Sequence, residues 1–483
     1  KLLLAYGTEE QKNYYLPRLA SGEEIPAFAL TGPHAGSDAG AMPDTGVVCY
    51  GKFKGNDKVL GIRLNWEKRY ITLGPVATVL GLAFKLYDPD HLLGDKENIG
   101  ITAALIPTNT PGINIGRRHF PLDSAFQNGP NWGKNVFIPM DWVIGGAAQV
   151  GNGWKMLMQC LSTGRAISLP ALSVGAAKFT SRNTGAYARI RKQFNLPIGE
   201  FEGIQEVLAR MAGQTYILDA ARQVTNAALD QGEKPAVISA ILKYELTERM
   251  RKVVNGGMDI QGGSGICLGP KNFLGRMYQV IPVSITVEGA NILTRTMMIF
   301  GQGAVRCHPY IQQEMTTIAT GDLAGFDRVF FQHIGHWSRN KAATLWLGLT
   351  NAAFVTAPGN KNTKNYYRQI ARFSAAFALL ADYGLLTLAG ALKRKERLSG
   401  RYADALGNLY LCSCVLKHYE NQGSLKEDEV LMHWACQESL FQTQEALAGI
   451  LAKLPLRPIA CMLYYVVFPL GKRLNPADDR LSQ

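Results

Sequence analysis

The period of the hydrophobic pattern changes along this chain, and that change constrains the fold most strongly. Between about Ala29 and Trp142, short runs of β-branched and aromatic residues are separated by turn-forming residues, a pattern typical of strands. From Trp154 onward, apolar residues instead recur every three or four positions, the spacing of one helix face. The 483 residues also suggest several domains. We therefore predict a multidomain α+β protein.

The β-rich region is expected to form a domain of its own. Its expected strands cover residues 47–50, 59–64, 70–73, 77–86 and 101–106. Turn signals such as Asp88-Pro89 and Thr110-Pro111-Gly112 separate these runs. Since no helical stretch of useful length interrupts them, this region is predicted to be all-β.

Helices are expected on both sides of the β-rich region. Before it, Thr8-x-x-Gln11 has the spacing of a capping box and begins a short helix that ends near Ser21-Gly22. After it, a second long helix is expected from about Pro235 to Asn255, with proline near its first turn. A first long helix has an apolar face formed by Ile204, Val207, Leu208, Met211 and Leu218.

Composition limits the compartment and the partners. The eight cysteines are scattered without a Cys-x-x-Cys pair, which suits a reducing compartment. The net charge of +13 is spread along the chain, and it suits a solvated surface, an anionic ligand or an acidic membrane face. No zinc knuckle or long basic tract accompanies this charge, so nucleic acid is not expected as a partner. No signal peptide opens the sequence and the first residue is Lys1, so we expect a fragment.

Glu288 is the main candidate for chemistry. It is the only acidic residue between Asp259 and Glu314, and its apolar surroundings make burial costly unless it is used or paired. The expected helix directly after it, with a stripe of Leu293, Met297 and Phe300, favours the ionised form. Apolar burial raises the pKa instead. Glu288 is therefore a catalytic base, a helix cap or the partner of an arginine such as Arg276.

Three segments suggest ligand contacts. Residues 29–40 combine glycines with hydroxyl side chains, so they form either a close backbone approach to a ligand or a tight turn. Tyr70 and Thr72 are expected on one face of a strand, where they can hold a flavin or form an ordinary surface. Residues 259–265 are rich in glycine but lack both the dinucleotide fingerprint and the nucleophile elbow. Rossmann and serine-hydrolase chemistry are therefore disfavoured.

Two further patterns have more than one interpretation. His333-x-x-His336 has helical spacing, but the sequence offers no further ligand, so no metal site is predicted. The apolar run Ile459–Leu470 is flanked by basic residues. It is too short to span a bilayer, and it suits either an interfacial helix or a buried core helix.

In this order and spacing, these segments resemble the acyl-CoA dehydrogenase family, most closely the enterobacterial long-chain FadE type. The resemblance covers residues 1–305 by motif, and the helical region after residue 310 resembles the C-terminal extension of that type. It implies the acyl-CoA dehydrogenase fold: a helical lead-in, a central β-domain and a C-terminal helical bundle, plus an extra C-terminal helical domain. Most of the N-terminal helical domain would be absent. The implied domains are residues 1–28, 29–143, 144–308 and 309–483.

The resemblance also implies FAD as cofactor and gives roles to individual residues. Glu288 matches the catalytic base, and Gly164 stands where some members carry the base instead. The implied substrate-binding residues are Ser37, Ser162, Arg165 and Gly289. The implied cofactor-binding residues are Leu30, Thr31, Gly36, Ser37, Tyr70, Ile71, Thr72, Arg191, Gln193, Phe194, Gln205, Asp259, Gly262, Gly263, Ala290, Asn291 and Ile292. Two departures are Gly32 in place of the usual Glu and Tyr70 in place of the usual Trp.

The implied reaction is FAD-dependent α,β-dehydrogenation of fatty acyl-CoA to trans-2-enoyl-CoA, the first step of β-oxidation. Electrons would pass to an electron-transferring flavoprotein. Because the FAD contacts cross subunits in the family, a homo-oligomer is implied. The expected location is the bacterial cytoplasm, with peripheral contact of the C-terminal domain to the inner membrane as an option. The alternatives are an acyl-CoA oxidase and a DNA-binding flavoprotein relative.

Overall fold

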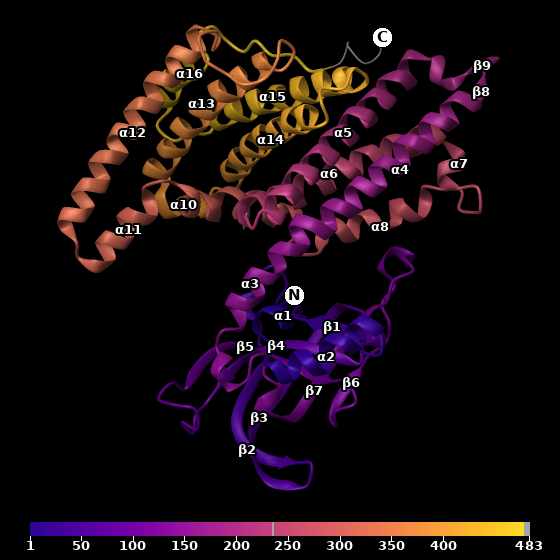
Figure 1. Cartoon of the computed structure of the whole chain (residues 1–483), viewed down its shortest axis with the longest axis vertical. Helices are drawn as coiled ribbons and strands as arrows, with labels where there is room; N and C mark the ends of the chain where they lie inside the picture. The colour runs from indigo at the N-terminus through magenta and orange to yellow at the C-terminus, as the bar shows by residue number, and fades with distance from the viewer. Residues whose placement is uncertain (234–235, 478–483) are drawn as a thin grey trace. The chain divides into compact units, whose positions relative to one another are not determined.

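The chain forms two compact units, Lys1–Thr163 and Gly164–Gln483 (Figure 1). The computed structural model describes residues 1–233 and 236–477, without the side chains of residues 161–163 and 393. Strands and the predicted helical lead-in make up the first unit, and helices dominate the second. The multidomain α+β prediction is therefore confirmed. The predicted domain boundaries remain predictions.

The first unit, which we call the β unit, is built around one seven-stranded sheet. The strands follow the order β1-β4-β2-β3-β7-β6, and β5 pairs with β4. The strands are β1 (Pro26–Ala29), β2 (Thr45–Phe53), β3 (Asn56–Thr72), β4 (Val79–Tyr87), β5 (Asn98–Pro107), β6 (Ile113–Ile115) and β7 (Asn128–Pro139). The helices are α1 (Leu2–Tyr6), α2 (Glu9–Ser21) and α3 (Gly153–Thr163). The capping box of Thr8 and Gln11 is present at the start of α2, as predicted.

The sheet differs from the sequence prediction most clearly at β3 and β7, and the short strands β1 and β6 were not predicted either. Residues 59–64 and 70–73 were expected as separate strands, but 59–64 and 70–72 both belong to the 17-residue strand β3. β7 was not predicted, because its sequence begins Asn128-Gly129-Pro130-Asn131 and reads as a turn. β7 pairs with β3 along most of its length, and this long-range pairing outweighs the weak local preference.

The second unit, which we call the helical unit, begins with the segments that surround Glu288. Its first helices are α4 (Leu169–Ile190), α5 (Glu202–Asp230), α6 (Ala236–Gln261), α7 (Gly263–Ile266), α8 (Gly275–Thr286), α9 (Asn291–Leu293) and α10 (Gly303–Cys307). Two π-helical segments join them, η6 (Gly164–Ser168) and η8 (Thr294–Gln302), and a hairpin of β8 (Lys192–Gln193) and β9 (Leu196–Pro197) follows α4. Met211 and Leu218 of α5 are buried, as predicted. α6 continues past the predicted end at Asn255 to Gln261, and Pro235 lies outside the described residues.

Further helices of the helical unit pack on the same core. They are α11 (Ile311–Thr320), α12 (Leu323–Leu349), α13 (Lys364–Leu388), α14 (Glu396–Asn421), α15 (Glu429–Leu451) and α16 (Arg457–Val467). One cluster of buried apolar side chains runs through α5, α6, α13, α14 and α15. Residues on both sides of position 308 thus share one core.

The helix expected after Glu288 has a different winding from the prediction. Residues 294–302 form a π-helix, whose i→i+5 hydrogen bonds change the angular position of each side chain. Phe300 is buried, but Leu293 and Met297 are only partly covered, while Thr294, Thr296 and Ile299 are buried. Of the predicted stripe, Phe300 is therefore buried, and Leu293 and Met297 are partly buried.

Two apolar helices are relevant to the predicted contact of the C-terminal domain with a membrane. Among the described residues, one stretch, Lys364–Leu392, is long and apolar enough to cross a membrane, and 44% of its apolar window is buried. A core helix of a globular protein passes the same test, and α13 contributes Phe373, Leu379 and Leu380 to the shared core. In α16, Ala460, Leu463 and Val467 are buried in that core. One face of the predicted apolar run therefore packs on the core, while Ile459, Met462 and Tyr465 are exposed.

Candidate active site

A sharp turn between α8 and α9 presents Glu288. Glu288 has φ = +55° and Gly289 has φ = +96°, so two consecutive residues are left-handed. Glycine adopts this conformation readily, whereas for glutamate it is uncommon. Such strained residues persist where the surrounding structure holds them, and they cluster at functional sites.

The carboxylate of Glu288 lies against the backbone of Gly164 in η6. A Cβ atom at position 164 would lie only 2.6 Å from Glu288 Oε2, closer than real Cβ contacts allow. Oε2 is buried and has no hydrogen-bond partner among the described residues. The sequence had identified residue 164 as the place where some relatives carry the base. In the fold, positions 164 and 288 converge on the same space.

Burial decides the pKa of Glu288, which the sequence had left open. Desolvation raises the pKa of its carboxyl group above the ordinary value, while the positive charges of Arg165 and Lys243 lower it to a lesser extent. The described residues contain no ion pair between Glu288 and Arg276, so that alternative receives no support. A carboxylate with a raised pKa and a free oxygen has the properties of a general base.

Two cations hold the backbone of the turn rather than the carboxylate. Arg165 Nε donates to Glu288 O at 2.6 Å. Lys243 Nζ donates to Gly289 O at 2.8 Å and to Ile285 O at 3.0 Å, so it links the two sides of the turn. Lys243 is fully buried, and burial lowers its pKa to about 8.

Asn291 joins the hydrogen bonds that Arg165 and Lys243 make to the turn, a set that we call the clamp. Its Oδ1 accepts the third hydrogen bond of Lys243 Nζ at 2.6 Å, and its Nδ2 donates to Thr247 Oγ1 at 2.9 Å and Glu248 Oε1 at 2.8 Å. The side chain predicted to contact FAD is thus fully engaged inside the helical unit. The sequence analysis missed Lys243, although it lies among apolar residues at helical spacing from Leu246 and Met250, a position that predicts burial.

The β unit brings its two predicted flavin segments together. Arg69 N donates to Thr31 O at 3.0 Å, and Lys68 Nζ donates to Leu30 O at 3.0 Å. Lys68 is anchored by an ion pair with Asp44 at 2.5 Å, in which both side chains are almost completely buried. The segment of Leu30 and Thr31 therefore lies beside the end of β3, as a shared ligand site requires.

The end of β3 exposes the side chains predicted to face the flavin. Tyr70 is 58% exposed and has φ = +61°, at a bulge in the pairing with β7. Thr72 is exposed, and Ile71 between them is buried in the sheet core. Ile71 can therefore offer only its backbone to a ligand. Gly36 and Ser37 are exposed on the neighbouring segment.

Other predicted cofactor residues lie far from Glu288. Arg191, Gln193 and Phe194 belong to the β8–β9 hairpin region. Asp259 ends α6, and with 1.5 Å per residue it lies about 24 Å along the helix from Lys243. The helical unit thus carries two separate groups, which suits the implied FAD contacts from neighbouring subunits.

The remaining predicted residues lie after α6, in the Glu288 turn and near the β8–β9 hairpin. Gly262 and Gly263 follow α6 on the surface, and Ala290 and Gly289 lie in the Glu288 turn. Gln205 donates to Gly199 O at 3.2 Å near the hairpin. The side chain of Ser162 lies outside the described part of the structure.

These residues fit FAD by their exposure and shape. Apolar side chains stand uncovered at three predicted contact positions, namely Tyr70, Phe194 at 89% and Ile292 at 79% exposure. The backbone at Gly36 and Gly263 is open, with no atom near the place of a Cβ. Flat apolar contacts and close backbone approaches are what an isoalloxazine ring and a pyrophosphate require.

Comparisons with known proteins agree with this arrangement. A family model described as Acyl-CoA dehydrogenase, C-terminal domain matches residues 151–299, and another, Acyl-CoA dehydrogenase, C-terminal, bacterial type, matches residues 305–483. A solved structure of an acyl-CoA dehydrogenase complexed with FAD, from Bacillus anthracis, superposes with a TM-score of 0.78 at 20% identity. It covers 100% of this chain and 78% of that one, so the entire described architecture is that fold.

Curated relatives match by sequence. The chain is 32% identical over 304 residues to an acyl-CoA dehydrogenase from Bacillus subtilis, covering 61% of this chain and 73% of that protein. It is 33% identical over 298 residues to acryloyl-CoA reductase (NADH) from Anaerotignum propionicum, covering 61% and 70%. A stretch of 104 residues is 58% identical to Protein HemX from Proteus mirabilis, covering 22% and 61%. The chain thus spans 61% to 73% of the length of these relatives.

Proposed function

This chain belongs to the acyl-CoA dehydrogenase family of FAD-dependent oxidoreductases, and from that premise we propose that it converts fatty acyl-CoA to trans-2-enoyl-CoA. This reaction is the first step of β-oxidation. The observation that carries the proposal is the Glu288 carboxylate, with a buried, unpartnered oxygen beside Gly164.

Glu288 takes the α-proton of the thioester. Its raised pKa makes it a stronger base than an exposed glutamate, and the positive charges of Arg165 and Lys243 favour the ionised form that accepts the proton. The clamp of Arg165 and Lys243 on the backbone keeps the carboxylate from rotating away from the substrate.

When bound, FAD supplies the acceptor for the hydride that leaves the β-carbon. The residues proposed to hold it are the segment Leu30–Ser37 with Tyr70 and Thr72 in the β unit, and Gly289–Ile292 in the helical unit. Contacts from Arg191–Phe194 and Asp259–Gly263 are proposed to come from a second copy of the chain. Electron-transferring flavoprotein is the proposed electron acceptor.

The bleaching of bound flavin by saturated acyl-CoA tests the proposal. We expect Glu288→Gln to bleach at least about 10³-fold more slowly than the unchanged enzyme, because a neutral amide cannot accept the proton. Glu206→Gln, an exposed glutamate on α5, serves as the matched control and bleaches normally. Equal rates in both variants would refute Glu288 as the base. A series of acyl chain lengths then identifies the preferred substrate.

A second candidate function is the reverse reaction, the reduction of an enoyl-CoA. The 33% identity to a protein named acryloyl-CoA reductase (NADH) favours testing enoyl-CoA reduction as well. The electron donor for this direction is tested with and without a partner protein. Anaerobic incubation with enoyl-CoA and NADH, with and without electron-transferring flavoprotein, separates the two directions. Peroxide formation after air is admitted identifies the remaining alternative, an acyl-CoA oxidase.

The branch within the family is also a proposal. We assign the chain to the long-chain FadE type because the bacterial-type C-terminal model matches residues 305–483. A preference for long acyl chains in the bleaching series supports this assignment, and a preference for short chains contradicts it.

A further inference from the structure

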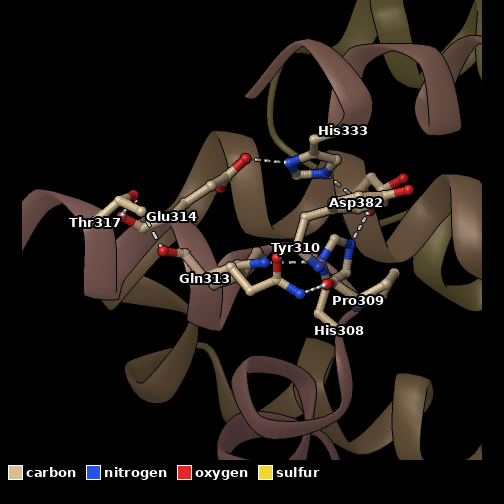
Figure 2. Close-up of polar contacts among 9 residues, drawn as sticks. His308, Pro309, Tyr310, Gln313, Glu314, Thr317, His333 and Asp382 are labelled. Atoms are coloured by element: carbon tan, nitrogen blue, oxygen red, sulfur yellow. Dashed lines mark hydrogen bonds and ion pairs between the residues drawn. The ribbon is translucent and has the colours of Figure 1, made fainter. Parts of the chain in front are cut away.

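Three segments of the helical unit bring His308, His333 and Asp382 together (Figure 2). His308 follows α10, His333 lies on α12, and Asp382 lies on α13. One possible ligand atom from each residue lies within 4.8 Å of the other two. The sequence offered only His333 and His336, and the fold supplies the other two residues.

Asp382 is a buried carboxylate without a fixed positive charge. Its side chain is only 5% exposed, and its ion-pair partners in the described residues are His308 Nε2 at 2.6 Å and His333 Nε2 at 3.6 Å. Its second oxygen, Oδ2, is buried and has no hydrogen-bond partner among the described residues. Since burying an uncompensated carboxylate is costly, a cation is expected here.

His333 is oriented as a metal ligand. Its Nδ1 lies 2.8 Å from Glu314 Oε1, so Nδ1 carries the proton and the lone pair of Nε2 faces Asp382. Histidines that bind metals commonly donate their other ring N–H to a carboxylate in this way. The ring of Tyr310 stacks on His333 with centroids 5.4 Å apart, which limits rotation of the imidazole.

We propose that His308 Nε2, His333 Nε2 and Asp382 bind one divalent transition-metal ion. Two imidazoles and a carboxylate match the ligand set of zinc, and a water molecule would complete the tetrahedron. With the imidazoles neutral, the charges of Asp382 and Glu314 balance a dication. The ion would tie the segment before α11 to α12 and α13.

The ring proton of His308 must move from Nε2 to Nδ1 when the ion binds. Its Nδ1 accepts the backbone N–H groups of Tyr310 and Ile311, both at 3.2 Å, so its ring proton lies on Nε2 and is donated to Asp382. The contact of 2.6 Å between His308 and Asp382 must also open to about 3.3 Å, the ligand separation of a tetrahedron with Zn–N bonds of about 2.0–2.1 Å. With the proton on Nδ1 the imidazole stays neutral, so the two backbone contacts to Nδ1 must open and binding releases no net proton from His308.

Calorimetric titration of the chelator-treated holoenzyme with ZnCl₂ tests the site. We expect one tight site, with affinity at least about 100-fold lower in Asp382→Asn and in His333→Gln. His433→Gln is the matched control, because His433 also lies near a glutamate, Glu429 at 3.6 Å, without a third ligand. Titrations in two buffers of different ionisation enthalpy should give the same heat, because the change of tautomer in His308 releases no net proton.

Cysteines are the main competing ligands for zinc, and cobalt(II) distinguishes them. A site of two histidines and one aspartate gives tetrahedral d–d bands without the sulfur-to-cobalt charge transfer of thiolate ligands. Zinc affinity and stoichiometry that are equal in the unchanged enzyme, Asp382→Asn and His333→Gln would overturn the proposal. So would an absence of saturable binding in the unchanged enzyme. Circular dichroism identifies a variant that fails to fold, and the other variant then decides.

Discussion

Gly164 has no side chain, and the Glu288 carboxylate lies where a Cβ atom at position 164 would be. The site therefore requires glycine at position 164. We expect Gly164→Ala to lower kcat/KM by about 10²-fold, since a displacement of the base of about 1 Å has an effect of this size. Gly175→Ala is the matched control, because a methyl group at Gly175 of α4 meets no atom within 4 Å. Steady-state kinetics with one acyl-CoA measure both variants, and equal activity would contradict the geometry.

Arg165 sets the ionisation of Glu288 as well as its position. The base must be unprotonated, and its pKa is raised by burial, so kcat/KM should rise with pH through a pKa above 4.5. Arg165 lowers this pKa, so Arg165→Gln should move the acid limb to higher pH, whereas Arg165→Lys should move it less. A pH profile of flavin reduction measures the shift. An acid limb at unchanged pH in Arg165→Gln would exclude the charge effect.

Lys243 is expected to act as a positioning residue. Lys243→Met removes the donor to Ile285 O, Gly289 O and Asn291 Oδ1, and a buried acceptor left without a donor costs about 1–3 kcal/mol, so both stability and kcat should fall. In the unchanged enzyme the ammonium group of Lys243 loses a proton as pH rises past about 8, so activity should decline above that pH. The decline should be absent in Lys243→Met, a difference that general destabilisation does not produce. Lys252→Met, at an exposed position of α6, is the control.

At the scale of elements, the π-helix η8 fixes the turn to the rest of the helical unit. Phe300 stacks on Tyr402 of α14 with centroids 4.1 Å apart, and Arg295 Nε lies 2.7 Å from Asp404 Oδ1. Both contacts come from residues that point toward α14 in the π-helical winding. The extra residue per turn thus aligns the segment after Glu288 with its packing partner.

Substitutions of Phe300 and Ile292 distinguish the role of this segment in packing from its role in cofactor binding. We expect Phe300→Ala to lower the free energy of unfolding by about 3–5 kcal/mol, the usual cost of deleting a buried aromatic ring. Ile292→Ala changes an exposed side chain and should alter stability by less than about 0.5 kcal/mol, while it weakens FAD binding. Denaturant unfolding and the FAD content after gel filtration measure the two effects. Equal destabilisation by both changes would contradict the packing described here.

At the scale of the whole molecule, the second group of cofactor residues depends on assembly. Phe194 is 89% exposed on the β8–β9 hairpin, so its ring is available to a second copy of the chain. We expect Phe194→Asp to lower both FAD content and the oligomer fraction without changing the helix content. Leu323→Asp, at a similarly exposed apolar residue that begins α12, is the control. Sedimentation velocity and FAD absorbance measure the outcome, and a fully loaded oligomer of Phe194→Asp would refute the cross-subunit contact.

The sequence by itself determined the classes of structure and selected Glu288 as the candidate base. Periodicity separated a β unit from a helical unit, because strand and helix repeats differ along the chain itself. The isolation of Glu288 among apolar residues, together with the family resemblance, identified the residue to test. These signals are local, so they can be read without knowing which segments meet.

The tertiary structure determined which segments are in contact and how these contacts change the properties of their residues. β7 formed because β3 pairs with it, against its own turn-rich sequence. Burial raises the pKa of Glu288 more than Arg165 and Lys243 lower it, because only the fold places its carboxylate against Gly164 and Lys243 beneath the turn. Asp382 joined His308 and His333 in the same way. Each of these outcomes depends on contacts between residues far apart in the chain, and no local pattern encodes such contacts.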